Sequence, residues 1–302
     1  MRSSALPILV AFLTGVLAGC GNSGGATDAK APSACAANAF KPGDHAVFVN
    51  SGGQRRFAIV HVPRGESQPL PVYLVLHFAG GRARAMERLT GLSKTGEEEG
   101  FLAVYPEADG ARHFWTLHAA AGRADDVAFI GKLLDRLEQV ACVDTRRVYA
   151  TGVSNGGGMA ALLACRMANR IAAVAPVAGG YSQIGQCAPA RPVSVLEIHG
   201  TGDRIVPYDG RPPERLGSVP RYLAGWVGRD GCPPKARRRP LGGRGAIRYD
   251  WGPCRDGTAV AHIKAIGAGH GLPPHPPFQG KAGRFDATAA IVRFFQAHPR
   301  GG

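Results

Sequence analysis

Residues 148–158 read VYATGVSNGGG and place Ser154 in the pattern Gly-x-Ser-x-Gly. A β-favouring series precedes the serine, and a helix-forming series follows it from Met159 to Met167. A serine at such a strand-to-helix turn is sterically crowded, so the flanking glycines let the backbone close and lift the hydroxyl above the sheet edge. The start of the following helix favours negative charge. The stretch predicts a serine nucleophile for acyl transfer; the plainer interpretation of the same glycines is a Gly-rich turn.

Apolar strand-like segments alternate with helix-like segments along the chain. The continuous apolar run at 71–77 is typical of a strand buried on both faces. One apolar stripe over 125–141 indicates an amphipathic helix that begins with two acidic residues. This alternation predicts an α/β fold in one domain over 41–302, a mostly parallel sheet with helices on both faces. Further strands are expected at 101–105, 171–177, 193–199 and 259–266, helices at 221–227 and 285–297, and a hairpin over 46–62.

A serine nucleophile needs a base that takes its proton and a carboxylate that orients the base. When a serine nucleophile follows a strand in this way, the acid and then the histidine are expected later in the chain. Asp203 follows the strand at 193–199, and His270 lies in a glycine-rich loop after the last strand. We therefore expect Ser154, Asp203 and His270 to be the catalytic residues. The alternatives are Asp209 or Glu197 as the acid, His275 as the base, and a structural turn role for Asp203.

The negative charge of a tetrahedral intermediate must be held by N–H donors. One donor is expected to be the backbone amide of Asn155, which follows the serine. The other should come from the loop after the strand at 71–77, where Ala79 is the first choice and Phe78 the second.

The first 19 residues have the features of an export signal. Arg2 is their only charge, and the apolar run that follows is too short for a permanent membrane span. Leu17-Ala18-Gly19-Cys20 resembles a bacterial lipobox, in which Cys20 is lipidated. Residues 20–40 would then be a lipidated flexible tether. The sequence predicts an exported protein anchored to the membrane, periplasmic or on the outer surface, and secreted if Cys20 is an incidental cysteine.

Removing Cys20 from the seven cysteines leaves an even number, as expected of disulfides in an oxidising compartment. Six cysteines allow 15 pairings, so the connectivity is not determined by sequence. Our expectation is Cys35–Cys142, Cys165–Cys187 and Cys232–Cys254, in which the last pair would link a basic loop to a strand at 246–251.

The formal net charge is +14, and much of it lies in residues 235–248. An exported protein seldom meets nucleic acid, and no aromatic residues interleave with these arginines, so no nucleic-acid partner is expected. Anionic lipid or cell-wall polymer could attract this loop, and a solvated loop without a partner is the alternative.

These features together resemble the polyhydroxybutyrate depolymerase and feruloyl esterase family, in particular its LpqC-like lipoprotein branch. The resemblance implies an α/β-hydrolase fold, neither metal nor organic cofactor, and hydrolysis of carboxylic esters. Many relatives have glycine at the position of Phe78, and Thr-Trp-Pro where Gly271-Leu272-Pro273 follows His270 here. The matching residues are Leu76-His77, Trp115, 125–130, 147–158, 172–180, 199–203, 206–208 and 267–270.

The aromatic residues beside these motifs are candidates for the substrate site, with core packing as the alternative. We expect Phe78, Trp115 and Tyr208 to contact the substrate, and Tyr181 and Trp226 are further candidates. The predicted function is an exported serine carboxylic ester hydrolase that forms an acyl-enzyme on Ser154. Its substrate would be a small ester, a polyester or an acylated polysaccharide. The alternatives are a cell-envelope acyltransferase with the same triad and an inactive binding lipoprotein.

Overall fold

The computed structural model describes residues 40–65, 68–110, 112–118, 125–181, 186–211, 217–241, 245–277 and 280–301. The chain divides into a unit of Met1–Ser33 and a unit of Ala34–Gly302, and the described residues all belong to the second. The predicted signal peptide, the lipidation site Cys20 and most of the tether therefore lie outside the described residues and stay predictions. No helix in the described part is long and apolar enough to cross a membrane.

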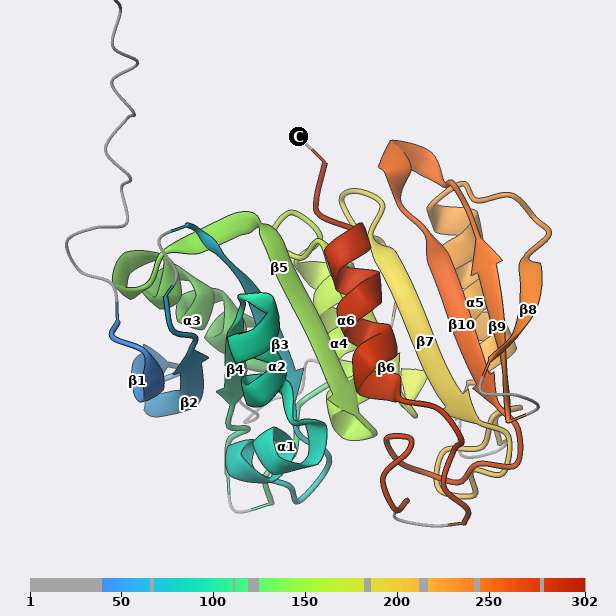
Figure 1. The fold of residues 1–302 in the computed structure, drawn as a ribbon, viewed down its shortest axis with the longest axis horizontal. Coiled ribbons are helices and arrows are strands. Elements are labelled where there is room, and N and C mark those ends of the chain that lie inside the picture. Colours follow the sequence, from blue (N-terminus) through green and yellow to red (C-terminus); the bar gives the residue numbers. More distant parts are fainter. Residues whose placement is uncertain are drawn as a thin grey trace, which may run out of the picture. The chain divides into compact units, whose positions relative to one another are not determined.

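The described residues form ten strands in one sheet. In chain order these are β1 (Gly43–Ser51), β2 (Gln54–Val62), β3 (Leu70–Leu76), β4 (Leu102–Pro106), β5 (Val143–Val153), β6 (Ala173–Val177), β7 (Ser194–Gly200), β8 (Arg237–Leu241), β9 (Ala246–Trp251) and β10 (Val260–Ala265). The spatial order is β1-β2-β4-β3-β5-β6-β7-β10-β9-β8 (Figure 1). The strands from β4 to β10 in this order are parallel, and antiparallel strands flank them at both edges.

Helices cover both faces of the sheet (Figure 1). One core contains side chains of α3 (Asp126–Val140), α4 (Asn155–Arg166) and α5 (Val219–Arg229). The core on the other face contains side chains of α1 (Ala83–Thr90), α2 (Leu92–Glu99) and α6 (Ala287–Ala297). Every residue of β3, β4, β6 and β7 is buried, because a central parallel strand has helices on both sides. The predicted α/β fold is confirmed.

Local sequence signals explain several element boundaries. Gly52 and Gly53 have positive φ values of 59° and 76° and form the two-residue turn of the predicted hairpin between β1 and β2. At the start of α3, the Asp125 side chain accepts a hydrogen bond from the Ala128 amide and caps the helix. Its neighbour Asp126 instead forms a buried ion pair with Arg56 at 2.8 Å, which ties α3 to β2.

The structure also contains elements that we did not predict. The helices α1 and α2 lie between β3 and β4, where the sequence shows no long apolar stripe. The basic segment that we expected to be a loop is partly the edge strand β8, which pairs antiparallel with β9. Its arginines are exposed, and charged side chains and a proline on an edge strand oppose pairing with a further strand.

Two of the three expected disulfides are present, Cys165–Cys187 and Cys232–Cys254. Cys142 is also disulfide-bonded. Its predicted partner Cys35 lies outside the described residues, so this pairing stays a prediction. Each of the two disulfides in the described part closes a loop with a sequence separation of 22.

We expect Cys165→Ser/Cys187→Ser and Cys232→Ser/Cys254→Ser each to lower the free energy of unfolding by about 3 kcal/mol. The loss should be similar in both variants, because loops of equal length release similar chain entropy when they open. Denaturant titration of the oxidised proteins measures it. A loss below about 1 kcal/mol in either variant would contradict the loop-entropy explanation for that bond.

Candidate active site

Ser154 lies at a sharp turn between β5 and α4. Its φ and ψ angles are 59° and −119°, a backbone conformation that is unfavourable for a residue with a side chain. The Ser154 amide donates to the carbonyl oxygen of Val177 at the end of β6, at 2.9 Å. This hydrogen bond anchors the strained residue to the neighbouring strand. The strand-to-helix turn predicted from the glycine pattern is therefore present.

Glycines permit this turn because backbone atoms pack against them. A Cβ atom at Gly156 would lie 2.2 Å from the carbonyl oxygen of Leu76 and 2.5 Å from that of His77. A Cβ atom at Gly152 would lie 2.6 Å from backbone atoms of Gly156 and Leu76. The first turn of α4 can approach the end of β3 so closely only without side chains at these positions. The glycines of the motif are thus required by the packing around Ser154.

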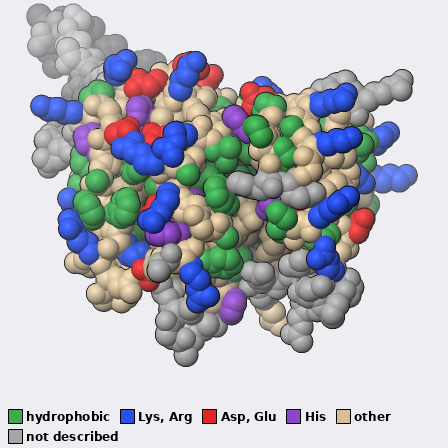
Figure 2. All heavy atoms as spheres, turned by 90° about the horizontal axis from the view of Figure 1, so that it is seen from below, with side chains coloured by type: hydrophobic (Ala, Val, Ile, Leu, Met, Phe, Trp, Pro, Cys, Tyr) green, Lys and Arg blue, Asp and Glu red, His purple; other side chains and the backbone are tan. Residues whose placement is uncertain are grey.

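The predicted site residues follow four parallel strands. Phe78 and Ala79 come after β3, Ser154 after β5, Asp203 after β7 and His270 after β10. The carboxyl ends of parallel strands meet at one edge of a sheet, where α/β proteins usually bind ligands. Figure 2 views this edge, where hydrophobic and histidine side chains lie between two groups of lysine and arginine side chains.

Asp203 and His270, which are 67 residues apart in sequence, are in direct contact. Nδ1 of His270 lies 2.7 Å from Oδ2 of Asp203, and both side chains are almost fully buried. Oδ1 of Asp203 accepts backbone N–H bonds from Ile205 and Val206 at 2.9 and 2.8 Å. The carboxylate is thus fixed on both oxygens. It orients Nδ1–H of the imidazole, so Nε2 is the nitrogen that can take and give a proton.

The structure supports Asp203 over the alternative acids. Asp209 is exposed, and Glu197 contacts other histidines. Among the described residues, no hydrogen bond joins the Ser154 hydroxyl to His270. The structure thus brings the acid and the base together and places the serine at the same sheet edge. Serine–histidine contacts in unliganded enzymes are often long and shorten when substrate binds.

A second, fully buried carboxylate lies behind Asp203. Glu197, in the middle of β7, accepts a hydrogen bond from the Tyr181 hydroxyl at 2.8 Å and contacts Nδ1 of His199 at 2.9 Å. Its other oxygen, Oε2, lies 2.6 Å from Nδ1 of His262 on β10. Two donors therefore reach Oε1, and the His262 ring lies against Oε2 while its Nδ1 makes a hydrogen bond to the Glu197 backbone carbonyl oxygen at 3.1 Å. A buried charge needs such partners, because the loss of its hydration is otherwise uncompensated.

His199 connects the two carboxylates. Its Nδ1 faces Glu197, and its Nε2 lies 2.8 Å from the Val206 carbonyl oxygen and 3.3 Å from Oδ2 of Asp203. Since both nitrogens face acceptors, the ring is a doubly protonated cation. Burial opposes this charge, but the hydrogen bonds and negative charges of Asp203 and Glu197 raise the pKa of His199 to about 10.

The same contacts keep both carboxylates ionised. Burial alone would raise the pKa of Glu197, but attraction from His262 and hydrogen bonds from His199 and His262 lower it to about 2. Burial opposes the ionisation of Asp203 too. Hydrogen bonds from His199 and His270 nevertheless hold the pKa of Asp203 well below its usual value. Asp203 is therefore a carboxylate at neutral pH, as the orienting role requires.

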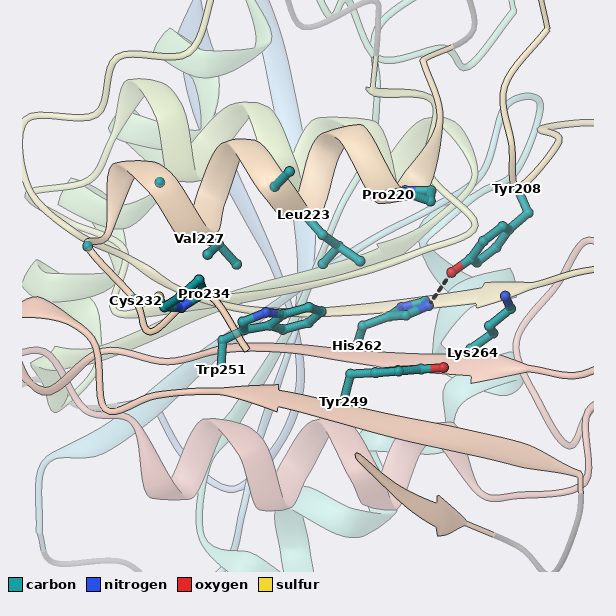
Figure 3. A pocket seen from close by; sticks show the side chains of 13 residues that line it. Tyr208, Pro220, Leu223, Val227, Cys232, Pro234, Tyr249, Trp251, His262 and Lys264 are labelled. Carbon is teal, nitrogen blue, oxygen red and sulfur yellow. Dashed lines mark hydrogen bonds between the residues drawn. The ribbon is translucent and has the colours of Figure 1, made fainter. Parts of the chain in front are cut away.

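The network extends from Glu197 to Tyr208. Nε2 of His262 lies 2.9 Å from the Tyr208 hydroxyl, and this hydrogen bond is drawn in Figure 3. Tyr208 belongs to the loop after β7 that also carries Asp203. Hydrogen bonds and ion pairs thus link Tyr208, His262, Glu197, His199 and Asp203 in a continuous series. Of this series, the sequence predicts Asp203 and Tyr208 as site residues and Glu197 only as an alternative acid.

The expected oxyanion loop is held by a neutral histidine. Nε2 of His77 accepts the backbone N–H of Ala108 at 3.0 Å, so this nitrogen carries no proton. Nδ1 therefore carries the proton and donates to the Phe78 carbonyl oxygen at 2.8 Å. Burial, the largest effect, lowers the pKa of His77 and favours this neutral form. The loop is thus fixed immediately before the exposed Ala79.

Asn155 and Trp115 connect this loop to the start of α4. The Asn155 side chain accepts from the Trp115 amide at 2.7 Å and donates to the Trp115 carbonyl oxygen at 3.1 Å. Nε1 of Trp115 donates to the His77 carbonyl oxygen at 2.9 Å. These bonds hold together the two segments that carry the expected donors, the amides of Asn155 and Ala79. The amide of Asn155, as the first residue of a helix, has no acceptor within that helix.

The structure places Trp115, Tyr181 and Trp226 in the core, whereas the substrate contact expected of Phe78 stays a prediction. Trp115 is fully buried, so it positions the loop and cannot touch a ligand in this conformation. Phe78 is half-buried and its ring packs against Gly81, where a Cβ atom would meet it at 3.2 Å. Tyr181 and Trp226 are core residues. Tyr208 lines a cavity between α5 and β10.

One group in the described part has the spacing of metal ligands: Asp44, His61 and Glu87. Both carboxylates pair with Arg84, and His61 lies between Asp44 and Glu97. Ion pairing accounts for the group, which lies on β1, β2 and α1 and contains none of the predicted site residues.

We expect Gly156→Ala and Gly228→Ala to have opposite effects, although both glycines are in helices. Gly156→Ala should lower the free energy of unfolding by about 3 kcal/mol or more, because the new methyl group meets backbone oxygens. At Gly228, near the end of α5, a methyl group would meet no atom within 4 Å apart from neighbouring residues and the nearby backbone of its own helix, so alanine should stabilise the helix by up to about 1 kcal/mol. Denaturant titration measures both. Equal stability of Gly156→Ala and the unmodified protein would contradict the close approach.

We expect the stability of the protein to fall as pH rises from 6.5 toward 10. The pKa of His199 is raised from its ordinary 6.5, so its contribution is complete below pH 6.5 and disappears toward pH 10. The pKa of Glu197 is lowered from 4.5, so its contribution disappears as pH falls toward 2. His199→Gln should weaken the alkaline decline, measured by urea unfolding at pH 6 to 10. His61→Gln, in the ion-pair group of β1 and β2, should retain it; an unchanged decline in His199→Gln would exclude His199 as its cause.

Comparison with known proteins supports these assignments of fold and family. Residues 56–208 match the family model of esterase PHB depolymerase. Feruloyl esterase B of Piromyces equi is 29% identical over 232 residues, which cover 71% of this chain and 42% of the relative. The bifunctional acetylxylan esterase/xylanase XynS20E of Neocallimastix patriciarum is 28% identical over 226 residues, 72% of this chain and 31% of the relative. The chain thus spans less than half the length of either relative.

In two further comparisons, the match covers most of the compared protein. The protein NocK of Nocardia uniformis is 30% identical over 279 residues, 80% of each chain. The solved structure of acetyl xylan esterase from Aspergillus awamori superposes with a TM-score of 0.62 at 16% identity, and the match covers 84% of this chain and 99% of that one. This structural likeness shows a common fold. The chain belongs to the esterase PHB depolymerase family and has the α/β-hydrolase fold.

Proposed function

We propose that this protein is a carboxylic ester hydrolase that uses Ser154, His270 and Asp203 as its catalytic triad. The observation that carries the proposal is the buried hydrogen bond between His270 and Asp203, at the sheet edge where the strained turn presents Ser154. Family membership supports the type of reaction, because the relatives named above include feruloyl and acetylxylan esterases.

In the proposed reaction, Nε2 of His270 takes the hydroxyl proton as Oγ of Ser154 attacks the ester carbonyl. The tetrahedral intermediate collapses, His270 gives the proton to the leaving alkoxide, and the acyl group remains on Ser154. Water, activated by His270, then releases the carboxylic acid and restores the serine. Asp203 holds Nδ1–H throughout and stabilises the imidazolium that forms in each half-reaction.

The oxyanion of both intermediates would be held by the amides of Asn155 and Ala79. The hydrogen bonds from Asn155 to Trp115 and from Trp115 to His77 fix the two segments that carry these amides. Donors that are fixed before the reaction need no reorganisation as charge develops, which is the main electrostatic contribution to acyl transfer.

For the substrate, we propose an acylated polysaccharide outside the cytoplasm. The name of one relative, an acetylxylan esterase, supports an ester on a polysaccharide, and that of another, a feruloyl esterase, supports a carboxylic ester. The export signal at residues 1–19 and the lipobox-like ending at Cys20 support a protein that is held at the membrane by a lipid anchor.

We expect Ser154→Ala to lower kcat for p-nitrophenyl butyrate at least about 10³-fold, because the acyl-enzyme can no longer form. Ser93→Ala, in α2, is the matched control and should retain activity. A fluorophosphonate probe should label the unmodified protein and Ser93→Ala but not Ser154→Ala. Equal turnover by Ser154→Ala would exclude Ser154 as the nucleophile, and absence of both turnover and labelling in the unmodified protein would refute the proposed hydrolase.

A further inference from the structure

A cavity of about 580 Å³ lies between α5 and the strands β9 and β10 (Figure 3). Its volume is in the range of small-molecule sites, which are usually apolar with a few polar groups. Ser154, Asp203 and His270 are not among its lining residues. We propose that this cavity binds a linear amphiphile whose apolar chain lies along β10 and whose single anionic head group contacts Lys264.

The walls of the cavity favour an apolar chain. Leu223 and Val227 of α5 form one side, and the rings of Tyr249 and Trp251 on β9 lie on the other (Figure 3). Pro234 lies at one end beside Cys232. Apolar surface that a ligand covers is removed from water, at about 25 cal/mol per Å². An elongated hydrocarbon would gain this contribution along the whole cavity.

Lys264 supplies the charge that selects the head group. It lies on β10 two residues after His262, so both side chains point to the α5 side of the sheet. Nζ of Lys264 lies 4.7 Å from the centre of the Tyr208 ring, and the residue is only partly exposed. In the part of the chain that the structure describes, Lys264 pairs with no carboxylate, whereas Arg248 on β9 pairs with Asp250. A partly buried ammonium group without a counter-charge favours an anionic ligand.

Two further polar side chains of the cavity, Tyr208 and His262, are paired with each other. The Tyr208 hydroxyl lies 2.9 Å from Nε2 of His262, and Nδ1 of His262 contacts Glu197. Lys264 is therefore the cation of the cavity that is available to an anion. A ligand with one charged end and no polar groups along its chain fits this distribution.

The register of the sheet sets the length of the chain. Trp251 pairs with Val260, and Lys264 is four residues further along β10. Four strand residues span about 13 Å, which corresponds to a saturated chain of roughly ten carbon atoms. Decanoate has this length and a single carboxylate.

The test uses the full chain with Ser154→Ala, so that binding is measured without turnover and independently of the proposed hydrolysis. Isothermal titration calorimetry should show saturable 1:1 binding of decanoate, with decanol and decylamine at least about tenfold weaker. Lys264→Met should weaken decanoate about tenfold or more and leave decanol unchanged. The control Lys94→Met, at an exposed position in α2, should bind decanoate normally.

Location is tested by filling the cavity. Leu223→Trp and, as a smaller change, Ala224→Met should each reduce decanoate affinity, with folding checked by thermal unfolding and near-ultraviolet circular dichroism. Absence of saturable decanoate binding to Ser154→Ala would overturn the proposal. So would equal affinity for decylamine, unchanged affinity in Lys264→Met, or unchanged affinity in both folded cavity variants.

Discussion

The buried carboxylate of Glu197 is the constraint on which the site and its surroundings depend. It lies at the centre of a strand that is buried along its whole length, and it contacts His199, His262 and Tyr181. An ionised group in such a place needs hydrogen bonds and opposite charges close to it. Glu197 therefore fixes both histidines on the two neighbouring strands β7 and β10, and through His199 it fixes the charge beside Asp203.

This arrangement explains why Asp203 and not Glu197 is the acid of the proposed triad. Glu197 is in contact with Tyr181, His199 and His262, and it lies within β7, below the sheet edge. Asp203 lies three residues beyond the strand and has one oxygen, Oδ2, directed to Nδ1 of His270. The positively charged ring of His199 lies near the same oxygen, Oδ2. This charge would keep Asp203 ionised even while His270 is neutral. The resting site would thus hold an ionised acid before any proton is transferred.

Much of the fold and part of the site follow from the sequence. The continuous apolar strands, the stripe at 125–141 and the glycine pattern around Ser154 each reflect one local requirement, and these predictions match the structure. Asp203 and His270 could be chosen because chain order limits the candidates, and their contact is now seen. The signal for Glu197 was also present, since a charged residue inside the apolar run VSVLEIH requires buried partners. Its partners could not be identified, because His262 and Tyr181 reach it only through strand pairing and packing across β7.

The roles of other residues could not be predicted, because their side chains contact residues that are distant in sequence. Trp115 was expected at the substrate because it is aromatic and near a motif. Its ring is instead buried against His77, and its backbone is bound by Asn155. Similarly, the basic residues of β8 gave no strand signal, because an edge strand needs neither apolar alternation nor burial.

The proposed oxyanion loop and the proposed acid–base pair are stabilised in different ways, and this difference follows from the charges of the histidines beside them. His77 is buried with a backbone N–H donor at one nitrogen and a carbonyl acceptor at the other, so it remains neutral and acts as a rigid link. His199 is buried between two carboxylates and a carbonyl oxygen, so it carries a proton on each nitrogen. Two buried histidines thus have different roles: the neutral His77 holds the loop after β3, and the charged His199 supplies a fixed cation after β7. The cation beside Asp203 favours the ionised form of the acid in the proposed triad.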